Sequence, residues 1–482
     1  MVLKKDYPYV LLAVVLAALA AMVAADFSES VGTYALIGII GIGVVLGIVV
    51  KPSLGGYILV IAVFSNFSSL LTDNGLPGII KPLVAVIFVA LVIRNFYIGQ
   101  ILMDRPRTVR VEFFIIAYFM AVAASYLVAT DRSLTLDRII DLVKDIVIVY
   151  CILFCIRQPQ EWKFATLAMV LVITVVCLLG VYQVVTGNYA QDFYGAAHVD
   201  RDLRLSGPVY DANFWGQILV AVIPFAIFGF LRESVNMKLL YAGAFVLVGI
   251  VLLNTYSRGA YLAFLIMAFL IMVFHARANI WLVSSIAAGL FLLMSVLPAS
   301  YADRLQTLTA LSSSDGSGVY QDLSLRGRSS EMLAGFAMFT DHPILGVGAG
   351  NYSLNYQKYA QVIGLEYRSR EREAHSLYLE ILAETGLFGF LSFIGIVFFL
   401  FTGLARIKKE LSYTKYYKEW YYHVSAVQIA FVGYLFAAIF LHDAYIRYFW
   451  ILTGLALALI QILHELMNSR NYSNHRDKPA QP

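Results

Sequence analysis

Residues 163–186, KFATLAMVLVITVVCLLGVYQVVT, decide the fold class, because after Lys163 they carry no charged side chain over a length that crosses a bilayer. Similar runs recur along the chain of 482 residues, of which 60% are hydrophobic and 14% are charged. The mean hydropathy is +0.76, and a soluble core cannot bury that much apolar surface. The sequence therefore predicts an all-α polytopic integral membrane protein.

Fourteen apolar runs are long enough to cross a membrane as helices. They are residues 8–25, 32–50, 54–71, 78–97, 112–129, 138–156, 163–186, 213–231, 238–254, 257–274, 280–297, 376–404, 423–441 and 446–467. The first run follows Lys4 and Lys5 like a signal peptide, but further spans follow at once, so we expect an uncleaved first helix. Cys151, Cys155 and Cys177 fall inside such runs, which predicts buried thiols without a disulfide.

The lysines and arginines orient these spans, because cytoplasmic loops of membrane proteins are enriched in positive charge. If the N-terminus is cytoplasmic, the inside segments hold ten lysines and the outside segments hold two. We therefore expect both termini inside. The net charge of +4 reflects this topology, and no basic arm suggests a nucleic-acid partner.

Positive charge on the outside is nearly all arginine, with twelve arginines against two lysines. Arginine binds phosphate through a planar fork of donors. Arg201, Arg204 and Arg258 lie in short outside loops, which favours an anionic ligand on this face. The alternative for Arg258 is an anchor whose charge reaches the membrane interface.

Residues 298–375 form one large outside loop, of which the Ser- and Gly-rich part at 312–318 is predicted to be flexible. Ser329 or Ser330 can cap a short helix that ends at Pro343. The apolar stripe of this helix suggests a position on the membrane surface. The stripe consists of Met332, Leu333, Phe336 and Ala337.

Four short motifs lie in order within the predicted outside layer. They are RLSGPVYDANFWG from Arg204, SRGAYLAF from Ser257, DHPILGVGAGNY from Asp341 and HSLYLEILAETGLFGF from His375. The glycines of GVGAGNY predict a tight turn, since no strand precedes them as a dinucleotide-binding loop requires. Together the motifs resemble the O-antigen ligase and O-antigen polymerase superfamily of bacterial envelopes, and the resemblance covers about residues 200–405.

The resemblance implies a membrane glycosyltransferase of the GT-C class with about 12–14 transmembrane helices and one large periplasmic loop. N-terminal transmembrane helices are then expected in residues 1–200, and an O-antigen ligase-like domain in 201–405. C-terminal transmembrane helices and a short cytoplasmic tail are expected in 406–482. The expected location is the bacterial inner membrane, with a multi-pass chain and cytoplasmic N- and C-termini.

The resemblance also implies a reaction and its partners. A glycan moves from an undecaprenyl diphosphate carrier to a hydroxyl of a glycan, lipid or protein acceptor on the periplasmic face. The enzyme is expected to be an O-antigen or exopolysaccharide ligase or polymerase that inverts the anomeric centre, surrounded by membrane lipids. No metal and no cofactor are expected. His198, Asp200 and Asp202 have oxygen-rich spacing that could hold a divalent cation, which is the alternative to metal-independent chemistry.

The motifs contain residue types that suit this chemistry. Arg204, Arg258 and Arg372 are expected to bind the diphosphate, whose negative charge grows as it departs. His375 is expected to take the proton of the acceptor hydroxyl, with a pKa near 6.5 unless Arg372 lowers it. The alternative for His375 is an ordinary hydrogen bond at a helix end. The expected supporting residues are Asp211, Asn213, Glu380 and Glu384, and the two glutamates could instead make structural pairs.

His442 and Asp443 top the thirteenth run and could line the acceptor side. Within the sixth run, Lys144 can be neutralised by Asp141 or Asp145, which predicts a buried ion pair, and a proton-coupled relay is the alternative. The alternative function is a polytopic transporter or flippase of a lipid-linked saccharide or small solute. A transporter would carry a charged pathway through both leaflets, whereas here the unusual charge gathers outside, which favours the enzyme.

Overall fold

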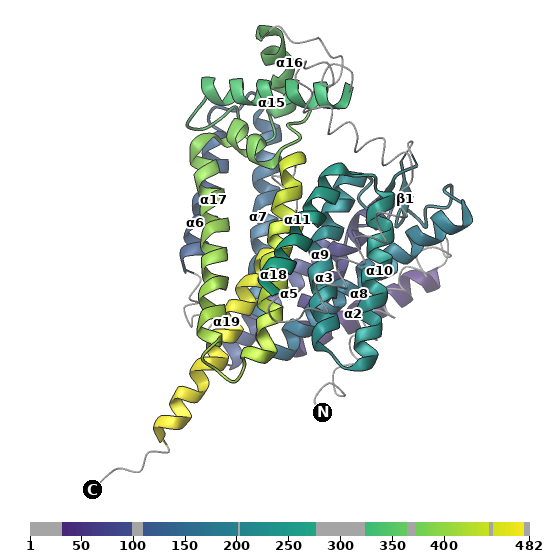
Figure 1. Ribbon diagram of the computed structural model, residues 1–482, viewed down its shortest axis with the longest axis vertical. Helices are drawn as coiled ribbons and strands as arrows, with labels where there is room; N and C mark the ends of the chain where they lie inside the picture. Colours follow the sequence, from purple (N-terminus) through teal and green to yellow (C-terminus); the bar gives the residue numbers. More distant parts are fainter. Residues whose placement is uncertain are drawn as a thin grey trace. The chain divides into compact units, whose positions relative to one another are not determined.

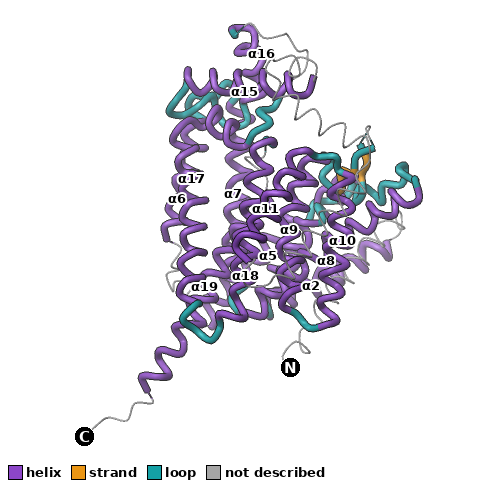
Figure 2. Tube along the Cα trace, in the orientation of Figure 1, coloured by secondary structure: helices purple, strands orange, loops and turns teal. Residues whose placement is uncertain are grey.

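The computed structural model describes residues 31–98, 109–200, 203–275, 323–363, 372–442 and 447–476. In this part of the chain nearly all regular structure is helical, apart from one short antiparallel pair of strands, β1 (His198–Val199) and β2 (Leu205–Gly207) (Figure 2). The predicted spans at 8–25 and 280–297 lie outside the described residues. A helix coincides with each of the other predicted spans.

The chain divides into two compact units. Unit 1 comprises Met1–Thr108, Val147–Val175 and Trp450–Pro482, and unit 2 comprises Val109–Ile146 and Val176–Phe449. Both units are discontinuous in sequence, because α7 (Arg132–Cys155), α8 (Pro159–Thr186) and α19 (Arg447–Arg476) each contribute to both. The sequence-based division at residues 200 and 405 stays a prediction.

Unit 1 contains four further helices, α2 (Val31–Val50), α3 (Pro52–Phe64), α4 (Phe67–Asp73) and α5 (Ile80–Ile98). Within it the buried Trp162 donates its indole N–H to the carbonyl of Leu455 over 2.9 Å. Such a bond satisfies a polar group that would otherwise be costly to bury in an apolar helix bundle.

Unit 2 holds the motifs. Its further helices are α6 (Val109–Ser125), α9 (Ala212–Arg232), α10 (Val235–Asn254), α11 (Arg258–His275), α15 (Leu323–Asp341), α16 (Tyr352–Val362), α17 (Leu377–Leu411), α18 (Tyr417–Ala437) and the short 3₁₀ helix η2 (Ala438–Phe440) (Figure 1). The α17 and α6 helices pack side by side, and α18 packs against α9, α11 and α17.

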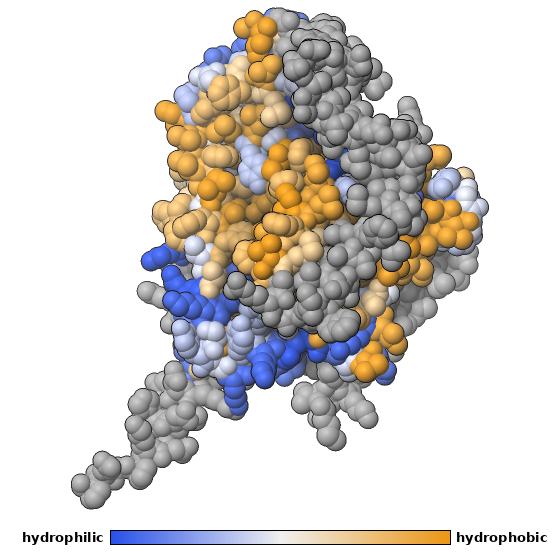
Figure 3. Space-filling model, viewed as in Figure 1, coloured by the Kyte–Doolittle hydropathy of each residue, from blue (hydrophilic) through white to orange (hydrophobic). Residues whose placement is uncertain are grey.

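Six of the described helices are long and apolar enough to cross a membrane, which confirms a multi-pass all-helical membrane protein. They are α8, α9, α10, α17, the continuous segment Tyr417–Phe440, and α19 over Arg447–Asn468. The α3 and α4 helices could form one further span that is bent by 60°. Apolar side chains cover the outer surface of α6 and α17, and hydrophilic atoms gather near the C-terminal end of α17 (Figure 3).

Two smaller predictions can be compared directly with the structure. All three cysteines are free and buried, as predicted. Lys144 pairs with Asp141 over 2.7 Å, but both side chains are more than one third exposed, so the prediction that this pair is buried was wrong. The reason is that the pair lies on a face of α7 that the helices of unit 2 leave open.

The α15 helix begins at Leu323, earlier than the capping serines predicted. Ser330 lies inside the helix, and its hydroxyl is hydrogen-bonded to that of Tyr356 over 2.9 Å, so a tertiary contact replaces the expected cap. Met332, Leu333 and Phe336 are more than half exposed, as a helix on a membrane surface requires. In Figure 1, α15 crosses the end of the α17 helix rather than running along it.

The α17 helix is broken at Gly386, and the GVGAGNY turn fills the break. Gly386 has φ 64° and ψ −164°, so the carbonyls of Ala383 and Glu384 lose their helical partners. The amides of Val347 and Gly348 donate to these carbonyls over 2.9 and 3.0 Å. In return, the amide of Leu387 donates to the carbonyl of Pro343 over 2.8 Å. The two motifs therefore fold as one interlocked structure.

Glycine is required at this break for two reasons. The backbone conformation of Gly386 is open almost only to glycine, and a Cβ there would lie 2.4 Å from the backbone of Ile344. Across the turn, a Cβ on Gly346 would lie 2.2 Å from the backbone of Glu384. Neither contact involves a flexible side chain that could move away.

We expect Gly386→Ala to destabilise the protein by at least about 3 kcal/mol, because strain and a backbone clash add together. The measurement is the thermal unfolding midpoint of the purified protein in detergent. The matched control is Gly243→Ala in α10, where nothing lies within 4 Å of the new methyl group and helix propensity improves. Equal midpoints for the two variants would contradict the interlocked structure.

Candidate active site

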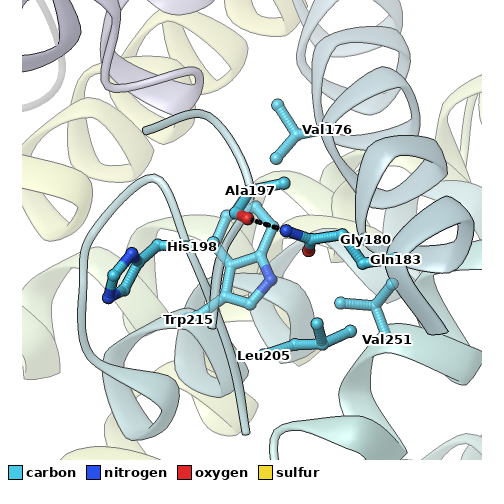
Figure 4. A pocket seen from close by; sticks show the side chains of 9 residues that line it. Val176, Gly180, Gln183, Ala197, His198, Leu205, Trp215 and Val251 are labelled. Atoms are coloured by element: carbon cyan, nitrogen blue, oxygen red, sulfur yellow. Dashed lines mark hydrogen bonds between the residues drawn. The ribbon is translucent and has the colours of Figure 1, made fainter. Parts of the chain in front are cut away.

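The segment that carries Arg204 is fixed by α8 and α9 before it reaches the site (Figure 4). The amide group of Gln183 donates to the carbonyls of Gln191, over 2.7 Å, and of Ala197. Gly207, at φ 55°, lies against the indole of Trp215, where a Cβ would come within 2.6 Å of the ring. The cavity between these residues is about 10 Å³, enough for one water molecule and too small for a substrate. The role of these residues is therefore to hold the segment in place.

Arg204 is held by its neighbours through two hydrogen bonds. Its Nε donates to the carbonyl of Thr255 over 2.9 Å, and one terminal nitrogen donates to the side chain of Asn213 over 2.9 Å. Asp200 lies 3.8 Å from Nε on the same side. The guanidinium therefore ties the start of α9 to the end of α10.

Asp211 and Asn213 both act at the N-terminus of α9. The carboxylate of Asp211 accepts from the amides of Asn213 and Phe214, over 2.7 and 3.0 Å, as an N-cap residue does. Asn213 then uses its side-chain oxygen to hold Arg204. The structure thus brings together three predicted site residues at one helix start.

Arg258 is the first residue of α11 and is half-buried. Its neighbour Gly259 lies against Phe440 of η2, where a Cβ would approach the ring to 3.0 Å. Phe440 precedes His442 by two residues, so the start of α11 lies next to the segment that carries this histidine. The first turn of a helix also presents backbone N–H groups that attract anions.

A second group of residues, which we call the histidine cluster, consists of Glu331, Arg372, His375 and His442. Glu331 is a buried residue of α15, and its carboxylate lies 3.6 Å from Nε of Arg372 and 3.9 Å from Nε2 of His375. His375 stands just before α17 with φ 45°, a left-handed conformation that turns the chain into the helix. Arg372 and His375, which the sequence placed together, are therefore joined through Glu331.

Aromatic rings connect the histidine cluster to α9. The imidazole of His442 stands edge-on to that of His375, with centroids 5.1 Å apart, and edge-on to the ring of Phe214 at 5.2 Å. Phe214 follows Asn213 directly. The start of α9, the end of η2 and the start of α17 thus converge, and they bring His375 and His442 close to the Arg204 group.

The environment keeps His375 neutral. Burial, together with the nearby His442, Arg328 and Arg372, lowers its pKa from 6.5 to about 4, against an opposing effect of Asp211. Burial also lowers the pKa of His442, against the raising effect of Glu373 and Asp211. At neutral pH the contact between His375 and Glu331 is therefore not an ion pair. A neutral imidazole has one nitrogen available to accept a proton.

The two predicted glutamates lie in different surroundings. Glu384 is buried, and its carboxylate accepts from the amides of Gly350 and Tyr352 over 2.7 and 3.0 Å, so it holds the glycine turn in place. Glu380 is buried in the first turn of α17, and its charge contributes to the raised pKa of Tyr352. Glu384 was expected either to support the site or to make a structural pair, and its contacts with the backbone amides fit the structural role.

Several predicted residues lie outside the described part of the chain, among them Arg201, Asp202 and Asp443. In the part that is described, no three His, Cys, Asp or Glu side chains are grouped as metal ligands. Asp200 instead accepts from the backbone of Arg204 over 3.0 Å, and His198 stacks on Tyr210.

Two members of the site were missed in the sequence. Glu331 directly precedes the predicted apolar stripe that begins at Met332 and follows Arg328 by three residues, and an acidic side chain in this place was a usable signal. Phe214 lies within a predicted motif, but nothing in the sequence distinguishes it from the other aromatic residues there. Its role depends on a contact with a residue more than 200 positions away.

Fold and site together define a multi-pass helical membrane protein with a histidine- and arginine-rich site at the starts of α9, α11 and α17. Residues 243–394 match the model of the O-antigen ligase family. This match agrees with the resemblance that the motifs predicted, and the family suggests a glycosyltransferase-like enzyme. The match includes Arg258, Arg372 and His375. Comparison with curated protein sequences gives no match.

Proposed function

We propose that this protein transfers a glycan from an undecaprenyl diphosphate carrier to an acceptor hydroxyl, on the periplasmic face of the bacterial inner membrane. The reaction is that of an O-antigen or exopolysaccharide ligase or polymerase, of GT-C type, which inverts the anomeric centre without a metal. The observation that carries the proposal is the convergence of His375 and Arg372 with the Arg204 group, in a chain with an O-antigen ligase domain.

The donor needs cations beside its diphosphate, because this group carries negative charge and gains more as it leaves. Arg372 and Arg258 are the side chains proposed to bind it, together with the first amides of α11. Arg204 contributes the positive charge of its guanidinium, which is bonded to Thr255 and Asn213. Its main role is to fix the start of α9 against this site.

The acceptor hydroxyl attacks the anomeric carbon while the bond from that carbon to the phosphate oxygen breaks. The proton of the hydroxyl passes to a nitrogen of His375, and the lipid diphosphate departs with the bonding electrons. Attack from the face opposite the leaving group inverts the anomeric centre. The carboxylate of Glu331, 3.9 Å from Nε2 of His375, stabilises the imidazolium that forms.

Binding of the donor also prepares the base. The diphosphate partly cancels the charge of Arg372 and Arg328, both of which lower the pKa of His375 in the free protein. The pKa of His375 therefore rises in the donor complex, which makes the imidazole a stronger base when the substrate is present.

Replacing His375 tests the proposal directly. We expect His375→Ala to lower glycan transfer by about 10²- to 10⁴-fold while donor binding is retained, because the base acts on the acceptor. Transfer is measured with purified protein and lipid-linked donor, and donor binding is measured separately. His375→Asn is the companion variant, since asparagine tolerates the left-handed backbone at this position.

The comparison variant is Arg258→Ala, which should weaken donor binding as well as transfer. If His375→Ala and His375→Asn lose binding and transfer equally, His375 belongs to donor recognition. Full activity in both would remove His375 from the site.

The pH dependence follows from the lowered pKa of His375. The base works deprotonated, so kcat/KM for the donor should rise with pH through about 4 and then stay level up to pH 8. The profile of kcat should show a higher apparent pKa, because it reports the donor complex. Identical profiles for kcat and kcat/KM would show that donor binding does not change the pKa of His375.

The orientation can be tested with two exposed residues of unit 2. Val362, at the end of α16, and Tyr413, after α17, have exposed fractions of 80% and 81%. In a background without the three native cysteines, we expect Val362→Cys to react with an impermeant maleimide on cells with a permeable outer membrane, and Tyr413→Cys to react only after lysis. The reverse pattern would place the site in the cytoplasm.

A further inference from the structure

An open cavity lies at the far end of unit 2 from the histidine cluster. It is lined by the α11, α17 and α18 helices and has a volume of about 450 Å³, which is within the range of small-molecule sites. Lys408 lies 22 residues beyond the break at Gly386, or about 33 Å along the helix, close to the thickness of the hydrocarbon core. The cavity therefore opens at the membrane interface opposite His375.

The lining of this cavity is divided by polarity. Leu270 and Phe274, near the C-terminal end of α11, and Phe401 of α17 belong to its apolar part. Lys408, Lys409 and Ser412 belong to its polar part, at the C-terminal end of α17. In the described part of the chain no acidic side chain lines the cavity. A ligand that fits this division has an anionic head and an apolar body.

Lys408 is held in a defined position by three neutral partners. Its ammonium donates to the hydroxyl of Ser425 over 2.7 Å and to the side-chain oxygen of Gln428 over 3.3 Å, and it lies 4.3 Å from the ring centroid of Tyr421. No carboxylate of the described residues lies within ion-pair distance of it. An ammonium has three N–H donors, so one remains for an anion.

We propose that this cavity binds an anionic phospholipid of the leaflet opposite the histidine cluster. The phosphate accepts from Lys408 and Lys409, and the glycerol and the first methylene groups lie against Phe401 and Leu270. The rest of each acyl chain stays in the bilayer beside α11 and α17. Hydrophilic atoms at this end of α17 and apolar atoms along its length agree with a headgroup at this depth (Figure 3).

The bound lipid contacts three helices at once. Its headgroup contacts α17 and α18, and its chains contact α11, so it stabilises their packing at the end where the cavity otherwise separates them. The site is separate from the glycan-transfer site and does not depend on the function proposed above.

The experiment uses the full-length protein, stripped of lipid in a neutral detergent, with the unfolding midpoint as the readout. Phosphatidylglycerol is titrated into the micelles, and parallel titrations use phosphatidylcholine and inorganic phosphate. We expect phosphatidylglycerol to raise the midpoint saturably at the lowest mole fraction. We expect Lys408→Gln to raise the half-saturating mole fraction by about tenfold, because a charge-assisted hydrogen bond is lost.

Two further variants make the result decisive. Ala405→Trp keeps the partners of Lys408 but fills the apolar part of the cavity, and it should abolish the saturable shift. Lys415→Gln removes an exposed lysine that does not line the cavity, and it should leave the titration unchanged. The proposal fails if Lys408→Gln and Ala405→Trp both titrate like the unchanged protein. It also fails if inorganic phosphate alone, or phosphatidylcholine equally, gives the full shift.

Discussion

The carboxylate of Glu384 is the constraint on which the site depends. The carboxylate accepts from two amides of the glycine turn, and the backbone carbonyl of Glu384 accepts from a third. One residue therefore satisfies three donors of a neighbouring segment. Such bonds to a buried carboxylate are stronger than bonds between neutral groups. These bonds hold the glycine turn in the break of α17. The glycine turn then fixes the end of α15 and the start of α16.

This arrangement determines where the chemistry can occur. Because α15 ends at the turn and α17 begins just before the break, Glu331 and His375 come from elements that the turn holds together. Asn351 extends the same structure to the start of α7, where its side chain binds the backbone of Asp131 and the hydroxyl of Thr135. His375 is therefore positioned by a rigid support of hydrogen bonds rather than by a free loop.

The sequence predicted the helices well, because a bilayer demands long apolar runs and these can be counted directly. The four motifs also predicted which segments would meet, and the structure brings His375 close to the group around Arg204. The sequence did not predict that Arg204 would donate two hydrogen bonds within its own chain, nor that the carboxylate of Glu384 would accept hydrogen bonds from backbone amides. Hydrogen bonds between segments far apart in sequence decide both roles, and no local pattern encodes them. The strong effect of burial on the pKa of His375 was hidden for the same reason.

The break at Gly386 determines which part of α17 lies within the bilayer. The 20 residues from Leu387 to Arg406 match the thickness of the hydrocarbon core, so the nine residues before Gly386 extend into the aqueous boundary. Under the proposed function, a glycan would reach His375 while keeping its hydration, and only the isoprenoid tail of the donor would remain among lipid chains. The cost of dehydrating a polysaccharide, which rises with every sugar added, would then be avoided at every glycan length. An enzyme built in this way would treat short and long glycans alike.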